Sequence, residues 1–276
     1  MGLWWYVKCF IHENYPIVLT LRTVWRPDMT LSTHGIFESL VIMHIITGTV
    51  GLISVWIPIA GKKGGVLHRQ ARNIFITSML TTGLVATGIS ITTLADPTGT
   101  HPQLSTHEVF RQPEMISGIF GWMMLYLATL TINLAWHGWL CMRNKRDHKK
   151  NGAWHNLLLQ VVLTVTSANC FIRGIELNQP MMMGIAFVGF ATVATNLWFI
   201  YRKPSSPKAR IKEHIKSLVG AGISVYTAFF AFGAVRLLPE IALTPGLWAI
   251  PLVTGLILII YHQRAVMAPV RRAHAT

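Results

Sequence analysis

The residues of this sequence best suited to chemistry are histidines that stand next to apolar segments. His68, His155 and His214 each end a basic stretch where an apolar stretch begins. Because a neutral imidazole nitrogen is a good ligand for zinc, copper or iron, three of them at one depth could form a metal site or ligate haem, with His137 as a further candidate. The neighbouring Lys and Arg side chains oppose a metal cation but favour haem propionates, a quinone headgroup or lipid phosphates. The alternative is that they are interfacial histidines, solvated by water and headgroups.

His44 is a different case because it lies inside an apolar segment. It stands eight residues into the stretch 36–59, roughly 12 Å deep at about 1.5 Å per residue. Ionisable residues at such depth usually face the interior of a helix bundle and often mark function. Thr47, Gly48 and Gly51 give the same helix a face of small residues on which another helix can pack closely. His44 could equally be a structural histidine that is hydrogen-bonded across that contact.

Arg173 and Glu176 form a third candidate group. Their spacing of three residues places them on one helix face, near the end of the chain's fourth apolar stretch, where they can satisfy each other. Together with His44 they could line an outer-leaflet cavity for an anionic or quinone-like ligand. The alternative is an arginine that reaches the interface and pairs there with an acid.

Two classes of site are less well supported by the spacing. A bis-histidine haem needs two histidines that face each other at one depth. His68 with His137 or His214 offers such pairings, but the spacing does not require haem. No Walker loop, no His-Glu-x-x-His and no Gly-x-Ser-x-Gly occurs. We therefore expect no hydrolase, ATPase or nucleotide-binding enzyme.

The composition indicates the class of protein that positions these residues. Of the 276 residues, 52% are hydrophobic and 12% are charged, whereas a soluble domain carries about 25% charged residues. The net charge of +14 lies mostly between apolar segments, where membrane orientation accounts for it, so we expect no nucleic-acid partner. A helix needs about 20 apolar residues to cross a bilayer. Seven stretches qualify: 36–59, 73–95, 115–142, 156–177, 181–201, 215–237 and 245–263.

The distribution of Lys and Arg predicts the orientation of these seven spans. Eighteen of the 24 lie on one side of the membrane, and the positive-inside rule makes that side cytoplasmic. The N-terminus is then outside and the C-terminus is cytoplasmic. We expect an all-α, multi-pass protein of the bacterial inner membrane, in contact with the lipid bilayer and with other membrane subunits. Its expected parts are an interfacial segment 1–34, a seven-span domain 35–264 and a basic tail 265–276.

A weak internal repeat suggests how the spans are grouped. A basic stretch that ends in a histidine precedes the second, fourth and sixth spans, at 62–68, 149–155 and 208–214. Each repeat opens a helix that runs from the inside to the outside. We therefore predict three helical hairpins in sequence, followed by a seventh span.

The same residues resemble a bacterial family of predicted multi-pass membrane proteins that is known only as a domain of unknown function. The resemblance covers roughly residues 36–95 and 208–240, and the family has a glycine between two arginines where this chain has Gln70-Ala71. It implies an inner-membrane fold in which four positions matter, and it brings no established reaction. The matching residues are His44, Lys63, Gly64, His68, Arg69, Arg72, His214 and the run Tyr226–Phe229, and the four positions are His44, His68, Arg69 and His214.

Two functions remain open at this point. The first is a histidine-bearing module that binds haem or quinone within or beside an electron-transfer chain, with His44, His68, His155 and His214 as ligands or hydrogen-bonding partners. The second is a non-catalytic accessory or scaffold subunit of a membrane complex, or a small-solute transporter. In that case Arg173 and Glu176 are internal structural residues.

Overall fold

The chain folds into a bundle of helices, and no strand occurs among the residues that the structure describes. The structure is a computed structural model that describes residues 33–104, 108–203, 206–237 and 244–267. The prediction of an all-α bundle with apolar helices is confirmed.

Both expected terminal segments fall largely outside the described residues. Of the expected interfacial segment 1–34, only the last two residues are described, and they begin the first helix. Of the expected tail 265–276, only the first three residues are described, and they end the last helix.

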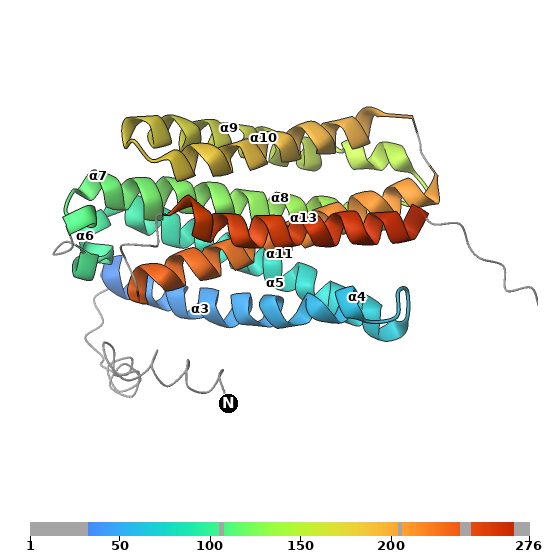
Figure 1. Ribbon diagram of the computed structural model, residues 1–276, viewed down its shortest axis with the longest axis horizontal. Coiled ribbons are helices and arrows are strands. Elements are labelled where there is room, and N and C mark those ends of the chain that lie inside the picture. Colours follow the sequence, from blue (N-terminus) through green and yellow to red (C-terminus); the bar gives the residue numbers. More distant parts are fainter. Residues whose placement is uncertain (1–32, 105–107, 204–205, 238–243, 268–276) are drawn as a thin grey trace, which may run out of the picture.

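The long helices lie side by side along one axis of the molecule (Figure 1). Short helices extend or connect them at the ends of the bundle. In chain order the elements are α3 (Thr33–Ser54), α4 (Trp56–Ala60), α5 (Val66–Ala95), α6 (Pro97–Thr100), η1 (Pro102–Leu104), η2 (Glu108–Phe110), α7 (Pro113–Ile116), the π-helical η3 (Ser117–Met123), α8 (Met124–Arg143), η4 (His148–Gly152), α9 (Trp154–Glu176), α10 (Pro180–Tyr201), α11 (Pro207–Leu237) and α13 (Pro245–Met267).

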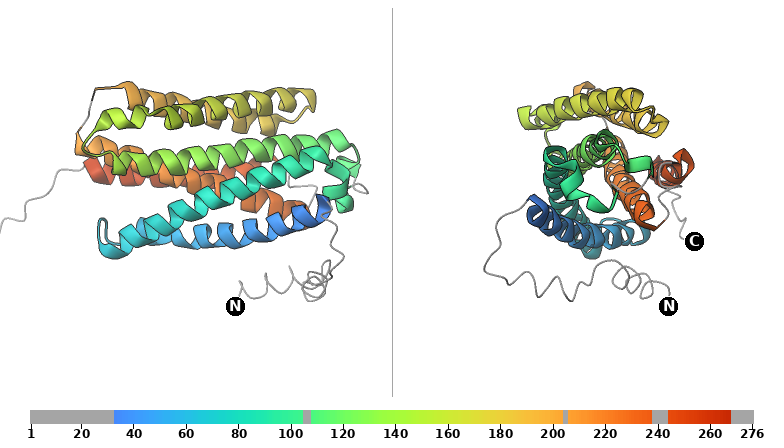
Figure 2. Two further views of the ribbon diagram at one scale, coloured as in Figure 1. Left: turned by 180° about the vertical axis from the view of Figure 1, so that it is seen from behind. Right: turned by 90° about the vertical axis from the view of Figure 1, so that its left-hand side faces the viewer.

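The helix α8 is the centre of the bundle. It packs against α5, α9 and α11, while α3 covers α5 and α13 covers α11. The hairpin of α9 and α10 lies on one side of the molecule and α3 lies on the opposite side, as both views show (Figures 1 and 2). A residue on α3 and a residue on α9 are therefore separated by the width of the bundle.

The burial pattern of α5 shows why the sequence forms a helix here. Ala71, Phe75, Met79, Thr82 and Ala86 are buried, and they recur every three or four residues. That period places them on one stripe of a helix, which faces the neighbouring helices α3 and α8. Other apolar side chains of α5, such as Ile74, Leu84 and Ile91, are exposed, as they are on the lipid-facing side of a membrane helix.

Only Asn178, Gln179 and Pro180 join the fourth and fifth apolar stretches of the sequence, which predicts a tight hairpin, and the turn between α9 and α10 confirms it. Helix α9 ends at Glu176 and α10 begins at Pro180. Asn178 adopts a left-handed backbone conformation, with φ of 52°, which asparagine tolerates better than most residues. Proline suits the first turn of a helix because the missing N–H would have no partner there.

Close packing of α10 against α8 and α9 depends on one glycine. A Cβ atom at Gly189 would collide with the Ser167 hydroxyl and would lie 2.7 Å from Cε2 of Tyr126. The Tyr126 hydroxyl donates to the carbonyl of Ile185, one turn earlier on α10, at 2.6 Å. The three helices can approach this closely only because position 189 carries no side chain.

Six helices are long and apolar enough to cross a membrane, where the sequence predicted seven. The helix α11 is not among the six; the side chains of its residues 231–237 lie outside the described part of the chain. The six are Thr33–Ala60, Val66–Ala95, Pro113–Arg143, Trp154–Glu176, Pro180–Tyr201 and Ala249–Met267.

Candidate functional site

A cluster of polar side chains, most of them buried, lies near one end of the bundle. We call this end the basic end, because the connections 61–65 and 144–153 and the residues 202, 203 and 206 lie there. Each of four neighbouring helices, α8, α9, α10 and α11, contributes two residues. The members of this polar cluster are Asn133, His137, Asn156, Gln160, Thr195, Asn196, Glu213 and Lys216.

Glu213 and Lys216 are the two charged residues of the polar cluster. Oε1 of Glu213 lies 3.1 Å from Nε2 of His137 and 2.5 Å from Nζ of Lys216. Lys216 also donates to Thr195 Oγ1 and to Asn196 Oδ1, both at 3.0 Å. An ammonium group has three donors, so every donor of Lys216 has a partner. The pair is largely removed from solvent, since the side chains are 12% and 21% exposed.

The amides of the polar cluster connect the helices. Asn196 donates to Asn133 Oδ1 at 2.9 Å and to Gln160 Oε1 at 3.3 Å, while its own oxygen accepts from Lys216. Asn133 in turn donates to the carbonyl of Leu159 at 3.1 Å. A buried amide without partners costs about 1–3 kcal/mol. These bonds therefore hold α10 against α8, α9 and α11 in one register.

The hydrogen bonds of His137 assign its protonation state. The carboxylate of Glu213 can only accept, so Nε2 of His137 donates to it. Nδ1 then accepts from Asn156 Nδ2 at 3.5 Å, and Nδ2 also donates to the carbonyl of Asn151 at 2.7 Å. His137 is therefore neutral, and the charges of Glu213 and Lys216 cancel. The Asn156 side-chain oxygen is buried and has no hydrogen-bond partner among the described residues.

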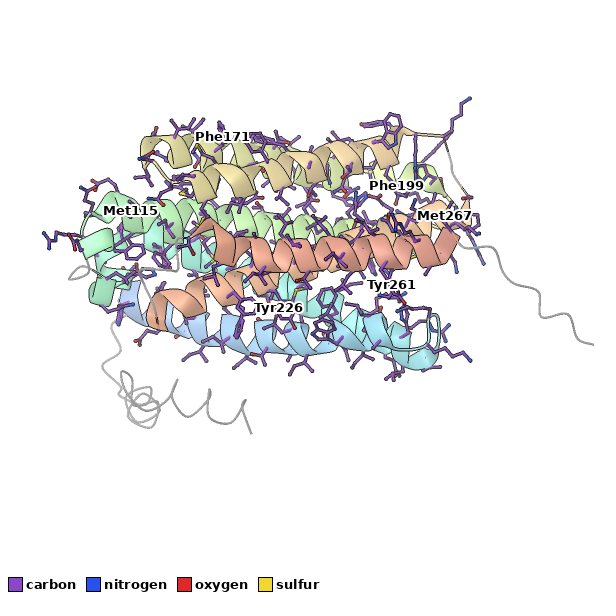
Figure 3. The ribbon with its side chains drawn as sticks, in the orientation of Figure 1. Met115, Phe171, Phe199, Tyr226, Tyr261 and Met267 are labelled. Atoms are coloured by element: carbon purple, nitrogen blue, oxygen red, sulfur yellow. The ribbon has the colours of Figure 1, made fainter. Side chains whose placement is uncertain are left out.

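Aromatic packing holds His137 in place. The ring of Phe199, near the end of α10 (Figure 3), meets the His137 ring edge to face, with centroids 5.7 Å apart. The Phe199 ring also contacts the ring of His148, with centroids 5.0 Å apart, and the guanidinium of Arg202, which lies 4.9 Å from the centroid of the Phe199 ring. His148 also bonds to the carbonyl of Phe199 at 3.0 Å. The imidazole of His137, which is fully buried, has little freedom to turn.

An apolar cavity of about 220 Å³ adjoins the polar cluster. Its walls come from α8, α10, α11 and α13, and include Leu130, Leu134 and Ile223. Lys216 and Thr195 belong both to the cavity and to the polar cluster. Among the described residues that line the cavity, Lys216 is the only one with a formal charge. The cavity therefore combines a long apolar wall with hydrogen-bonding groups at one end.

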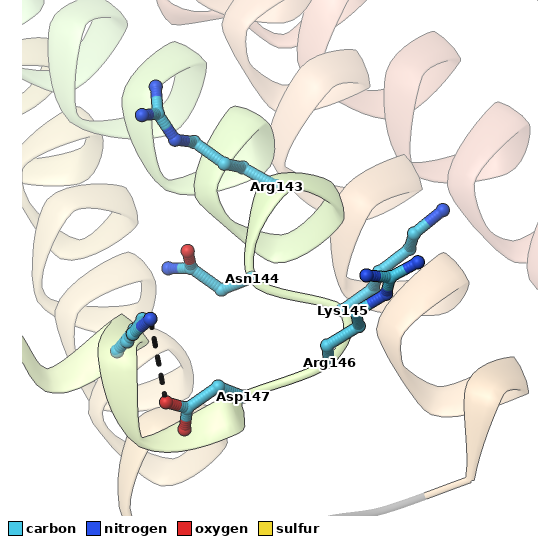
Figure 4. Close-up of a pocket in the computed structure, with 6 residues that line it drawn as sticks. Arg143, Asn144, Lys145, Arg146 and Asp147 are labelled. Carbon is cyan, nitrogen blue, oxygen red and sulfur yellow. Dashed lines mark ion pairs between the residues drawn. The ribbon is translucent and has the colours of Figure 1, made fainter.

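A second hollow lies at the loop that follows α8, and it is more open. It has a volume of about 500 Å³ (Figure 4). Its only acid among the described lining residues is Asp147, which lies 3.8 Å from Lys150. This surface is positive and suits contact with anionic headgroups. The other lining residues are Arg143, Asn144, Lys145 and Arg146.

The structure places His44 at the predicted contact of small residues. Gly48 and Gly51 are buried, and Cβ atoms there would meet side chains of α5. Thr82 of α5 donates to Thr47 at 2.9 Å across this contact. Nδ1 of His44 is buried without a hydrogen-bond partner among the described residues. The predicted close packing of this face is confirmed.

The other predicted histidines do not form one group. His68 and His214 lie near enough to each other to interact electrostatically. His214 is buried, and its Nδ1 lies 2.7 Å from the carbonyl of Gly138. His68 also has a buried Nδ1, without a partner among the described residues, while Arg69 is exposed. His155 lies instead between the rings of two tryptophans, Trp136 and Trp154, with centroids 5.6 and 5.9 Å away.

In the described part of the chain, no three His, Cys, Asp or Glu side chains are arranged to hold a metal ion. His137, a candidate ligand by sequence, is committed to Glu213 and Asn156. Of the histidines at the starts of successive helices, His68 and His214 lie near each other, whereas His155 packs against two tryptophans.

Arg173 and Glu176 form the predicted pair. Nη1 of Arg173 lies 2.8 Å from Oε2 of Glu176, and the side chains are 43% and 51% exposed. The guanidinium also lies over the ring of Trp122, 5.8 Å from its centroid. Because α9 and α3 lie on opposite sides of the bundle (Figure 1), this pair does not share a cavity with His44.

Comparison with known proteins adds no assignment. No family model, curated protein or solved structure matches the chain.

The sequence contained a signal for the polar cluster that the search for histidines and charge pairs did not use. Asn133 and His137 are four residues apart in an apolar stretch, and so are Asn156 and Gln160. Such spacing puts both members of a pair on one helix face. Two polar residues on one face of an apolar helix indicate a buried contact with another polar helix face.

Proposed function

We propose that this chain is a multi-pass membrane protein that binds a lipid-soluble, quinone-like ligand beside an electron-transfer chain. The observation that carries the proposal is the apolar cavity that ends at Lys216 and Thr195. A quinone has an apolar tail, which the walls would cover, and carbonyl oxygens, which can accept a hydrogen bond from an ammonium or hydroxyl group. Such a combination of an apolar pocket with a few polar groups is typical of ligand sites.

The size and lining of the cavity favour quinone over haem. A volume of about 220 Å³ is below the roughly 300–1,000 Å³ of pockets that enclose drug-sized ligands, so it suits a single ring with part of its chain and is too small for a macrocycle. None of the described residues that line it is a histidine. The four histidines proposed as ligands from the sequence would then be structural residues or make other contacts; they are His44, His68, His155 and His214.

The proposal includes seven spans with the basic end in the cytoplasm of a bacterium. Helix α11 packs against α8 and α13, both of which belong to candidate spans, and at about 1.5 Å per residue its 31 residues are long enough to cross a bilayer. The basic loops share one end of the bundle, as the positive-inside rule requires of cytoplasmic loops.

Blocking the cavity tests this function. Ala191 lines the cavity and is exposed, so Ala191→Phe is expected to close it without disturbing the core. Ala194, one turn further along α10, is also exposed but does not line the cavity, so Ala194→Phe is the matched control. Binding of decyl-ubiquinone is measured by quenching of tryptophan fluorescence, with the protein in phosphatidylcholine nanodiscs. We expect saturable binding that Ala191→Phe weakens about tenfold or more and Ala194→Phe leaves unchanged.

The opposite results have a clear meaning. If the unaltered protein shows no saturable binding, the quinone proposal is wrong, and the chain is better described as a scaffold subunit or a transporter. If both phenylalanine variants bind as the unaltered protein does, the ligand lies elsewhere.

A further inference from the structure

The charge balance around Lys216 bears on which head group the cavity accepts. This inference rests on the proposed function. The ammonium of Lys216 is already neutralised by the carboxylate of Glu213, 2.5 Å away, and His137 adds no charge because both of its ring nitrogens are engaged as described above. An anionic head group at Lys216 would therefore bring a net negative charge into a site that is neutral and largely buried.

One hydrogen bond of Lys216 can be exchanged for a bond to a ligand. Thr195 lines the cavity, and its hydroxyl also donates to the carbonyl of Ala191 at 2.8 Å. It keeps that bond when Lys216 turns away. The other two contacts of Lys216 are harder to give up. Asn196 is fully buried, so its side-chain oxygen would have no donor without Lys216. Breaking the contact with the Glu213 carboxylate would separate two opposite charges in a largely buried site. The site can thus offer one N–H donor to a ligand at little cost.

We propose that Glu213 makes the cavity selective for neutral carbonyl head groups over anionic ones, and that removing its charge abolishes this selectivity. A neutral carbonyl needs only one donor, and it gives up little hydration. An anion gives up much more hydration on burial. The ammonium compensates for that loss only where no carboxylate has already cancelled its charge.

Two probes with ten-carbon chains test the selectivity. Decyl-ubiquinone presents neutral carbonyls, and decanesulfonate is anionic at every pH used. Both are titrated into protein in phosphatidylcholine nanodiscs, for the unaltered chain and for Glu213→Gln. A glutamine still offers an oxygen to His137 and Lys216, so the geometry is retained. We expect the unaltered protein to bind decanesulfonate about tenfold or more weakly than decyl-ubiquinone, and Glu213→Gln to bind decanesulfonate at least about tenfold more tightly than the unaltered protein does.

The matched control is Glu114→Gln. The loss of Glu114 changes the net charge by the same amount, but Glu114 is exposed and lines neither hollow. We expect Glu114→Gln to bind both probes as the unaltered protein does. Equal tightening of decanesulfonate binding in both variants would overturn the inference, because it would reveal a general effect of net charge.

The remaining outcomes separate this inference from the proposed function. If decyl-ubiquinone binds but decanesulfonate binds equally well, or if Glu213→Gln leaves decanesulfonate binding unchanged, the selectivity is wrong and the quinone site stands. If neither probe binds the unaltered protein, the proposed function itself is overturned. Should Glu213→Gln fail to fold, the double variant Glu213→Gln/Lys216→Met carries neither charge. It is expected to bind decanesulfonate no more tightly than the unaltered protein does, and tight binding would overturn the inference.

Discussion

Replacing Lys216 with methionine is expected to destabilise the protein by roughly 3–5 kcal/mol. The change leaves the carboxylate of Glu213 beside neutral His137 without a cation, in a site where Glu213 is only 12% exposed. It also removes the donor to Asn196 Oδ1. Thermal unfolding in detergent, followed by tryptophan fluorescence, should show a midpoint lower by on the order of 10 °C.

Two further variants show whether the effect comes from an unpaired buried charge. Lys216→Met combined with Glu213→Gln removes both charges, so it should recover most of the lost stability. Lys150→Met removes a lysine that is 71% exposed and 3.8 Å from Asp147. Such exposed pairs contribute about 0–1 kcal/mol, so its midpoint should barely move. A double variant as unstable as the sum of its single changes would contradict a coupled pair.

Replacing Gly189 with valine is expected to cost about 3 kcal/mol or more. The new side chain would meet Ser167 of α9 and the ring of Tyr126 of α8, both buried. Neither α8 nor α9 can move away without breaking the amide bonds that hold α10 in register. The same unfolding measurement should show a lower midpoint and a reduced yield of folded protein.

Gly184 is the matched control for this prediction. It lies in the same helix, is exposed, and a Cβ atom there would meet nothing within 4 Å. Gly184→Ala should leave the midpoint unchanged or raise it slightly, because alanine favours a helix by about 1 kcal/mol over glycine. If Gly189→Val were as mild as Gly184→Ala, then α10 would not pack as closely as described.

Features that depend on neighbouring residues in the chain could be predicted from the sequence. The helices, the hairpin at Pro180, the ion pair of Arg173 with Glu176 and the small-residue face beside His44 all follow from local spacing. Local spacing reports which residues share a helix face, and it does so whatever the rest of the chain does.

Features that depend on which helices become neighbours could not be predicted in the same way. His137 and Glu213 meet although 76 residues separate them, because α8 packs against α11. His68, His155 and His214 share a position at the starts of helices, but that position does not fix the direction of their side chains. His68 and His214 therefore lie near each other, while His155 packs against two tryptophans. The contacts among the amides of the polar cluster depend on helix packing in the same way.

The difference in span count concerns a single helix. The predicted span 215–237 lies on α11, and the six candidate spans were found among the described residues only. The side chains of residues 231–237, which make up the last part of the predicted span, lie outside the described part of the chain. The seventh span therefore stays a prediction.

The central claim is that the cavity beside Lys216 holds an apolar chain with a carbonyl head. The most direct measurement is photolabelling with a decyl-quinone that carries a diazirine at the end of its chain, followed by peptide mass spectrometry. The account predicts labels on the cavity walls, at residues such as Leu130, Leu134 and Ile223, and their loss in Ala191→Phe. Labels spread over lipid-facing residues such as Ile53 and Val165, and unchanged by Ala191→Phe, would contradict it.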